Sequence, residues 1–225
     1  MENHYKVIDV NKRNRKTQFL YFNKFSNSTY SFNVRLDVTN IVKYSKETKT
    51  SFFINFLYVL TLSLNEVEEF RLRYVDDEVR LYDWIRATYT VRSDDGTFNN
   101  ARNEGFDPIY KNFYKETHEE VEKAKANLAH SDIFNDSGLY DDFYFTCLPT
   151  LDLVAMTHPI NDFEKPSQYV PRALWSKFVL EGDRYKMMLN LTVSHALVDG
   201  FPLANGFLKI QENIDNFLKI IAKVE

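Results

Sequence analysis

The residues best placed to do chemistry lie in the segment "NLTVSHALVDGFPLANG", Asn190 to Gly206. His195 ends a run of residues typical of a β-strand, and Asp199-Gly200 follows it as a turn signal. Pro202 then marks the first turn of a predicted helix. A histidine at such a junction lies at the edge of a sheet, where a neutral imidazole can act as a general base.

Other interpretations of His195 also fit the residue types. A buried, hydrogen-bonded structural histidine is common, and sequence physics alone favours it. A metal site shared with Asp199 is less favoured, because residues four apart share a face only within a helix and the predicted helix begins after Gly200. The remaining histidines are expected at the solvated surface (His4, His118 and His130) or in a structural role at the end of a strand (His158).

The elements that must position His195 are predicted from hydrophobic periodicity. Ser28 to Asn40 alternates apolar and polar residues, which predicts a strand with one buried face. Phe52 to Leu64 predicts a buried helix, and Asp76-Asp77 predicts the turn of a hairpin. Further strands are predicted over "DFYFTCL", "LDLVAMT", "ALWSKFVLE" and "YKMMLNLTVS", and helices over 107–128 and from Pro202 onward.

Strands and helices follow one another without regular βαβ repetition, and most links between strands are short. This order predicts an α+β two-layer sandwich, in which a largely antiparallel or mixed β-sheet is covered by helices. No linker or repeat divides the sequence, so one domain over residues 1–225 is expected.

Composition restricts the classes of partner. The net charge of -4 and the absence of a basic cluster argue against nucleic acid and membrane surfaces. Cys147 is the only cysteine, which excludes an internal disulfide and a CxxC site. The N-terminus has no apolar core typical of a signal peptide, so a cytoplasmic location is expected.

The segment "SHALVDGFPLANGF" resembles the C-terminal signature of the chloramphenicol acetyltransferase family, H-x-x-x-D-G followed by a helix. His195, Asp199 and Gly200 match that pattern. "RNRKTQFLYF" resembles the family's early helix, with Arg15 and Phe19 at matching positions. "STYSFNVRLDVT", "EFRLRYVDDEVRLYDWIRATYTV" and "FVLEGDRYKMMLNLTVSH" resemble its first strand, a hairpin region and its last hairpin. The resemblance therefore runs in order over nearly the whole chain.

This resemblance implies a CoA-dependent acyltransferase fold and a homotrimer that binds acetyl-CoA and a small-molecule hydroxyl acceptor, such as chloramphenicol, near the subunit interface. By analogy, His195 is the general base that deprotonates the acceptor, without a metal ion or an acyl-enzyme. Asp199 pairs with Arg15 and, with Gly200, supports the loop that orients the histidine. Phe22 is expected to face the substrate pocket. Phe178 is expected at the position of an aromatic residue that stacks on the adenine of the coenzyme.

The sequence departs from the family pattern at the serine that stabilises the oxyanion, because Ala155 occupies its position. Losing one such donor typically lowers the rate by about 10²–10³. A threonine that helps to order the intermediate corresponds to Leu174. Three explanations are open: Thr157 supplies the hydroxyl from the same strand face, the alignment is displaced by two residues so that Thr157 is the serine's equivalent, or the protein is a weakened or inactive member that binds CoA or an alcohol without efficient turnover.

Overall fold

The computed structural model describes residues 4–128, 140–161 and 164–222. Its main sheet has the strand order β2-β10-β8-β7-β5-β6, with β9 paired to β10. The strands are β2 (Thr29–Asp37), β5 (Arg86–Arg92), β6 (Phe98–Arg102), β7 (Asp142–Leu148), β8 (Arg172–Ser176), β9 (Val179–Glu181) and β10 (Arg184–Ser194). β7 pairs in parallel with both β5 and β8, whereas the other pairs are antiparallel. The sheet is therefore mixed and largely antiparallel, as predicted.

A smaller sheet has the order β1-β4-β3. Its strands are β1 (Tyr5–Ile8), β3 (Leu72–Val75) and β4 (Glu78–Tyr82). Asp76 and Asp77 join β3 to β4 with positive φ angles of 52° and 61°, a backbone conformation that aspartate tolerates in a tight hairpin turn. The predicted hairpin is confirmed, and β1 adds to it as a strand that periodicity did not indicate.

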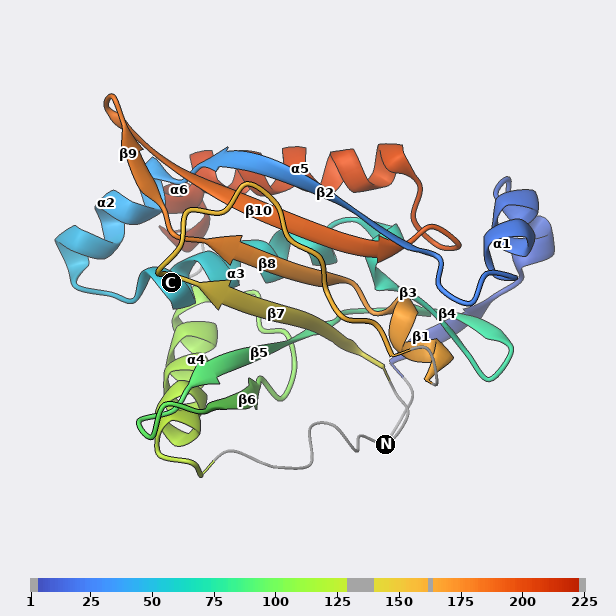
Figure 1. The fold of residues 1–225 in the computed structure, drawn as a ribbon, viewed down its shortest axis with the longest axis horizontal. Coiled ribbons are helices and arrows are strands. Elements are labelled where there is room, and N and C mark those ends of the chain that lie inside the picture. Colours follow the sequence, from blue (N-terminus) through green and yellow to red (C-terminus); the bar gives the residue numbers. More distant parts are fainter. Residues whose placement is uncertain (1–3, 129–139, 162–163, 223–225) are drawn as a thin grey trace.

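The helices cover one face of the main sheet, except α1, which lies beyond its end (Figure 1). They are α1 (Lys16–Phe22), α2 (Thr39–Thr48), α3 (Phe52–Asn65), α4 (Tyr110–Lys125), α5 (Gly200–Asp215) and α6 (Phe217–Ala222), and short 3₁₀ helices cover Val10–Lys12, Glu68–Arg71 and Lys165–Tyr169. Figure 1 shows α3 and α5 behind the sheet, while the segment that follows β7 crosses the opposite face. This arrangement confirms the α+β fold, and it leaves the front face of the sheet open to loops and ligands.

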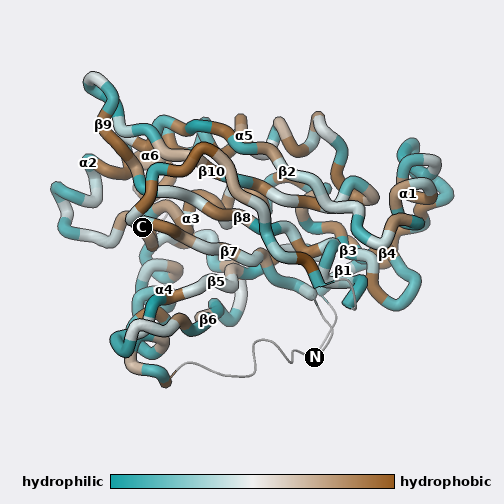
Figure 2. Tube along the Cα trace, viewed as in Figure 1, coloured by the Kyte–Doolittle hydropathy of each residue, from teal (hydrophilic) through white to brown (hydrophobic). Residues whose placement is uncertain are grey.

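Helix α3 forms the centre of the core. The hydroxyl of Ser51 caps it by accepting a hydrogen bond from the Ile54 N–H, and ten of the fourteen residues of the helix are buried. Figure 2 shows hydrophilic residues at the outer turns, such as the tip beyond β9. Within the described residues, no helix is long and apolar enough to cross a bilayer.

Gly206 brings α5 close to the core because it has no side chain. A Cβ added there would lie 2.6 Å from two ring atoms of Phe70, which is itself fully buried. We expect Gly206→Ala to lower stability by about 1–2 kcal/mol, since overpacking outweighs the roughly 1 kcal/mol gain in helix propensity. Chemical denaturation should show this loss, whereas Asn205→Ala, on the exposed side of the same helix, should not. Equal stability of the two variants would contradict the close contact.

The strand predicted over "LDLVAMT" (151–157) is wrong: this segment is irregular. β7 already has β5 on one side and β8 on the other, so no ladder position is open beside it. Val154 is 88% exposed, which also shows that the run is not a buried strand. Two smaller corrections concern "ALWSKFVLE", which forms the two strands β8 and β9, and the last predicted helix, which is interrupted at Asn216 between α5 and α6.

Candidate active site

The loop between β10 and α5 holds His195 at the end of a central strand. The His195 N–H donates to the carbonyl of Ser28 (2.8 Å), which continues the pairing of β10 with β2. The N–H groups of Leu197 and Val198 then donate to the carbonyl of Ser194 at 3.1 and 2.9 Å and close a tight turn. α5 begins directly after this turn. The local hydrogen bonds therefore fix where the histidine leaves the sheet.

Arg15 fastens this loop from the other end of the chain. Its guanidinium donates to both carboxylate oxygens of Asp199, with Nε–Oδ2 at 2.5 Å and Nη2–Oδ1 at 2.6 Å. It also donates to the carbonyls of His195 (3.2 Å), Ala196 (3.3 Å) and Leu197 (2.7 Å). A planar guanidinium can make this set of bonds at once, whereas an ammonium group cannot. Arg15 therefore binds the backbone carbonyls of the turn as well as the Asp199 carboxylate.

Two aromatic rings hold the imidazole. Phe22 stacks on His195 with ring centroids 3.9 Å apart, and Tyr30 stacks on it at 4.6 Å. Two rings cannot stack on one face of an imidazole at these distances, so they lie on opposite faces. The Tyr30 hydroxyl donates to the Val198 carbonyl (3.1 Å), and burial raises the pKa of Tyr30 to about 12, which keeps it neutral. The sandwich fixes the plane of the ring.

The His195 side chain remains 32% exposed, so the ring is not closed off from solvent. Its Nδ1 lies 3.3 Å from Asp199 Oδ1, without the alignment of a hydrogen bond. The carboxylate is therefore engaged mainly by Arg15, and its charge lies beside the imidazole. Sequence reasoning did not find Tyr30 as a partner of His195, because the contact depends on the pairing of β2 with β10 and not on local pattern.

Ala155 and Thr157 both lie exposed on the irregular segment that crosses the front of the sheet. Met156, which lies between these two residues in sequence, is hydrogen-bonded to side chains of the sheet. Its N–H donates to Asn33 Oδ1 (3.4 Å), and Asn190 Nδ2 donates to its carbonyl (3.1 Å). Because the segment is not a strand, the argument that Thr157 shares a strand face with Ala155 is wrong. The side-chain amides of Asn33 and Asn190 therefore bind this segment to the sheet, although its backbone does not pair with a strand.

Within one chain, this segment and His195 are not brought together. Met156 lies beside Asn190, and His195 follows Asn190 by five positions, about 16 Å along the direction of β10. Leu174 is the cross-strand neighbour of Asn190 and is buried. The positions of Ala155 and Leu174 therefore lie in the same part of the sheet, away from the chain's own imidazole.

Apart from Leu174, the residues that follow one another across this part of the front face are polar. Successive Cα partners in the sheet are Asn33–Asn190, Asn190–Leu174, Leu174–Thr146 and, on the outer strands, Thr90–Asn100. A cavity of about 540 Å³ opens over the outer part of this face. Its lining includes Thr90, Asn100, Tyr144, Thr146, His158 and Arg172.

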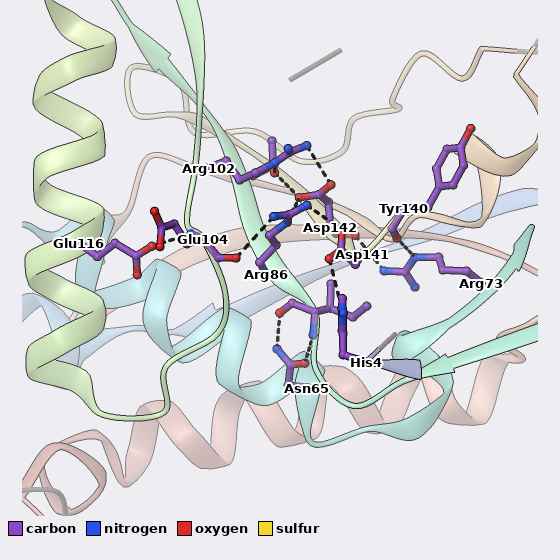
Figure 3. A network of polar contacts seen from close by, with 12 residues as sticks. His4, Asn65, Arg73, Arg86, Arg102, Glu104, Glu116, Tyr140, Asp141 and Asp142 are labelled. Atoms are coloured by element: carbon purple, nitrogen blue, oxygen red, sulfur yellow. Dashed lines mark hydrogen bonds and ion pairs between the residues drawn. The ribbon is translucent and has the colours of Figure 1, made fainter. Parts of the chain in front are cut away.

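A buried ion-pair network closes one end of the cavity (Figure 3). Asp142 accepts from Arg86 Nε (3.2 Å), Arg102 Nη2 (3.1 Å) and the Thr88 hydroxyl (2.6 Å). Burial raises the pKa of Asp142, and the Arg102 and Arg86 guanidinium groups oppose that rise. In the same network, His4 lies 3.2 Å from Asp141. The charges are compensated inside the protein, so the network supports the end of the sheet.

Phe178 lies at the opposite end of β10 from His195. It packs against Phe52 and Tyr185, with ring centroids 4.8 and 5.6 Å apart. Since Tyr185 is the second residue of β10 and His195 follows its end, Phe178 and His195 are roughly 30 Å apart within the chain. A ligand that touches both Phe178 and His195 must therefore be long or must use two copies of the protein.

The other histidines differ in their surroundings. His118 is exposed, as expected, but His4 stacks on Trp84 at 4.3 Å and is not a solvated surface residue. His158 lines the cavity and does not end a strand, which corrects the interpretation of that residue. His130 lies outside the described residues.

Thiol and metal chemistry find little support at this site. Burial raises the pKa of Cys147 to about 12, so its thiol stays protonated and unreactive near neutral pH. Among residues 4–128, 140–161 and 164–222, no three His, Cys, Asp or Glu side chains are grouped to hold a metal ion.

Comparison with known proteins matches the geometry to one family. The family model of chloramphenicol acetyltransferase matches residues 3–211. A chloramphenicol acetyltransferase of Proteus mirabilis is 25% identical over 223 residues, covering 95% of this chain and 96% of that protein. A solved chloramphenicol acetyltransferase superposes with a TM-score of 0.81 at 23% identity, covering 93% of this chain and 99% of that one. A dihydrolipoamide acetyltransferase of Azotobacter vinelandii superposes at 0.68 with 15% identity, covering 92% and 88%. The fold is thus that of the CoA-dependent acyltransferases.

Proposed function

Since this chain belongs to the chloramphenicol acetyltransferase family, we propose that it transfers the acetyl group of acetyl-CoA to a hydroxyl of a small molecule such as chloramphenicol. The observation that carries this proposal is the exposed imidazole of His195, held between two aromatic rings on a loop that Arg15 fastens. A hydroxyl is a weak nucleophile near neutral pH, so a fixed neutral base is the group that the reaction needs.

In the proposed mechanism, His195 takes the proton of the acceptor hydroxyl as its oxygen attacks the thioester carbonyl. The tetrahedral intermediate then collapses, the C–S bond breaks, and the CoA thiolate recovers the proton from the imidazolium. The Asp199 carboxylate, 3.3 Å from Nδ1, lies where it stabilises the positive charge that the ring carries between these steps. Asp199, Arg15 and Gly200 act on the position of the ring and do not transfer protons.

We also propose a homotrimer whose active sites lie between subunits. The supporting observation is that His195 lies away from its own Ala155 and its own Phe178, and does not line its own front-face cavity. A second copy that presents its front face to this loop brings base, acceptor and coenzyme together. Phe22 then borders the acceptor, and Phe178 stacks on the coenzyme. We assign the protein to the cytoplasm, as its single, half-buried cysteine allows.

The test is acetyl-CoA consumption with a panel of alcohols that includes chloramphenicol. Release of the CoA thiol is followed with a thiol-reactive dye, with and without each acceptor. Acceptor-dependent release that is lost in His195→Ala supports the proposal. Its absence for every alcohol, in a folded trimer, contradicts it.

A second candidate function is binding without efficient turnover, and Ala155 is the observation that favours it. A methyl group donates no hydrogen bond to an oxyanion, and the neighbouring Met156 N–H is already bonded to Asn33. This function predicts that CoA or an alcohol raises the melting temperature while no product forms.

Restoring the hydroxyl distinguishes the two functions. If the protein is an enzyme with an incomplete oxyanion site, Ala155→Ser should raise kcat by about 10- to 100-fold, because one donor is worth about 10²–10³ where it is fully aligned. Steady-state kinetics of CoA release measure this change. Val154→Ser, one residue away and 88% exposed, is the matched control and should leave kcat unchanged. An unchanged kcat in both variants would favour Thr157 as the donor or binding without turnover.

A further inference from the structure

The front-face cavity holds polar groups that the fold does not use. Thr90, Asn100 and Thr146 are half-buried and line the cavity. No hydrogen bond among the described residues engages their side chains, nor the Tyr144 hydroxyl. A ligand that covers these groups removes them from water, and leaving one unpaired beneath it costs about 1–3 kcal/mol. These groups are therefore available to a ligand that can both donate and accept.

His158 adds an acceptor of a different kind to the same cavity. Its Nε2 is buried and has no hydrogen-bond partner in the described part of the chain. Burial, together with the positive charge of Arg172, lowers the pKa of His158 to about 4. The ring is neutral at pH 7, so the unpaired Nε2 is an uncharged hydrogen-bonding group open to a ligand.

The charged groups around the cavity are already engaged. Asp142 is neutralised by two arginines, and Glu164 accepts a hydrogen bond from the Tyr140 hydroxyl (2.9 Å). Arg172 donates to the Val170 carbonyl (3.1 Å) and to the Ser167 hydroxyl (2.8 Å). The polar groups without a partner are uncharged, which favours a neutral molecule over an ion.

The unpaired polar groups of the cavity favour a polyol over an aromatic acceptor. Tyr89 and Phe145 belong to the core, so the apolar surface of the lining is that of Pro159, Ile160 and the rings of Tyr140 and Tyr144. A nitrophenyl ring would cover the hydroxyls of Thr90 and Thr146 without giving them a partner, whereas a molecule with several hydroxyls would pair with them. The volume of about 540 Å³ is that of an ordinary small-molecule site.

We infer that this cavity binds a neutral, polyhydroxylated acceptor, such as a sugar or cyclitol, with Thr90, Asn100, Thr146 and His158 as its specificity-determining groups. The inference rests on the proposed function, since it assigns the acceptor of that reaction. In the assembled site, the base of a second copy would act on one hydroxyl while this cavity holds the others.

The experiment compares two acceptor classes on the full-length protein. CoA release is measured with methyl glucoside, methyl galactoside, myo-inositol and chloramphenicol, in the unmodified protein, Thr90→Val and Thr90→Ser. We expect turnover with at least one polyol and a KM for it that rises about tenfold or more in Thr90→Val, equivalent to one lost hydrogen bond. Thr90→Ser keeps the hydroxyl and should stay within about threefold, and the KM for acetyl-CoA should not change.

Thermal shift with the same polyols separates this inference from the proposed function. Stabilisation by a polyol that disappears in Thr90→Val, without CoA release from any acceptor, supports the cavity assignment and contradicts the acetyl transfer. Turnover of chloramphenicol alone, equal in all three proteins, overturns the polyol assignment and leaves acetyl transfer intact. If no polyol stabilises the protein and none is turned over, the polyol assignment is also overturned. If Thr90→Val does not fold, Thr146→Val provides the same comparison on β7.

Discussion

His195→Ala should lower kcat/KM for acetyl transfer by about 10²–10⁴, the range that a positioned general base contributes. Stability should change by no more than about 1 kcal/mol, because the lost contacts are the two stacked rings and the side chain is already 32% exposed. Steady-state CoA release and thermal denaturation of the same preparations measure both effects.

A matched control for this variant is His118→Ala, which removes an imidazole from an exposed position on α4. It should change neither activity nor melting temperature. If His195→Ala instead unfolds the protein, the histidine is a structural residue, as its type alone would favour. If it folds and turns over normally, the base lies elsewhere.

Arg15→Ala should reduce stability and activity together, since it removes the pair with Asp199 and the bonds to three successive carbonyls. Both side chains of the pair are about 30% exposed, so the energy of this ion pair lies between that of a surface salt bridge and that of a buried one. The expected loss of stability is therefore about 1–3 kcal/mol. Below the melting temperature, kcat should fall roughly 10- to 100-fold while the KM for acetyl-CoA stays constant, because a misplaced base slows chemistry without affecting coenzyme contacts.

The control lies two residues away. Arg13 pairs with Glu68 at the surface, and Arg13→Ala should cost less than about 1 kcal/mol and leave kcat unchanged. Arg15→Lys should recover little, because a lysine cannot make the two-pronged bond to Asp199. A positioning role for Arg15 would be contradicted by kcat values that remain normal once the folded fraction is taken into account.

Local sequence pattern is enough to predict the elements whose signals lie in neighbouring residues. The alternation of β2, the apolar run of α3 and the hairpin at Asp76-Asp77 are properties of neighbouring residues. The prediction of a strand over 151–157 is wrong: these residues have strand-like polarity but belong to an irregular segment. What excludes it from the sheet is the insertion of β7 between β5 and β8, and this is a non-local fact.

The candidate site likewise contains some residues that a motif predicts and others that only the folded chain brings together. Arg15, Asp199, Gly200 and His195 were found because their spacing resembles a family motif. The rings of Phe22 and Tyr30 meet around His195 only once α1 and β2 have packed beside the loop. The polar cavity depends on the register of strands far apart in sequence, so no motif could reveal it.

The contact of Arg15 with Asp199 has a further consequence for how the protein is made. The two residues are separated by 184 positions, so at 5–20 residues per second the arginine leaves the ribosome about 10–40 s before its carboxylate partner. During that interval the newly made amino-terminal helix lacks its principal anchor. A message that stops short of codon 199 would therefore yield a chain whose earliest and latest segments never join, however well its middle has folded.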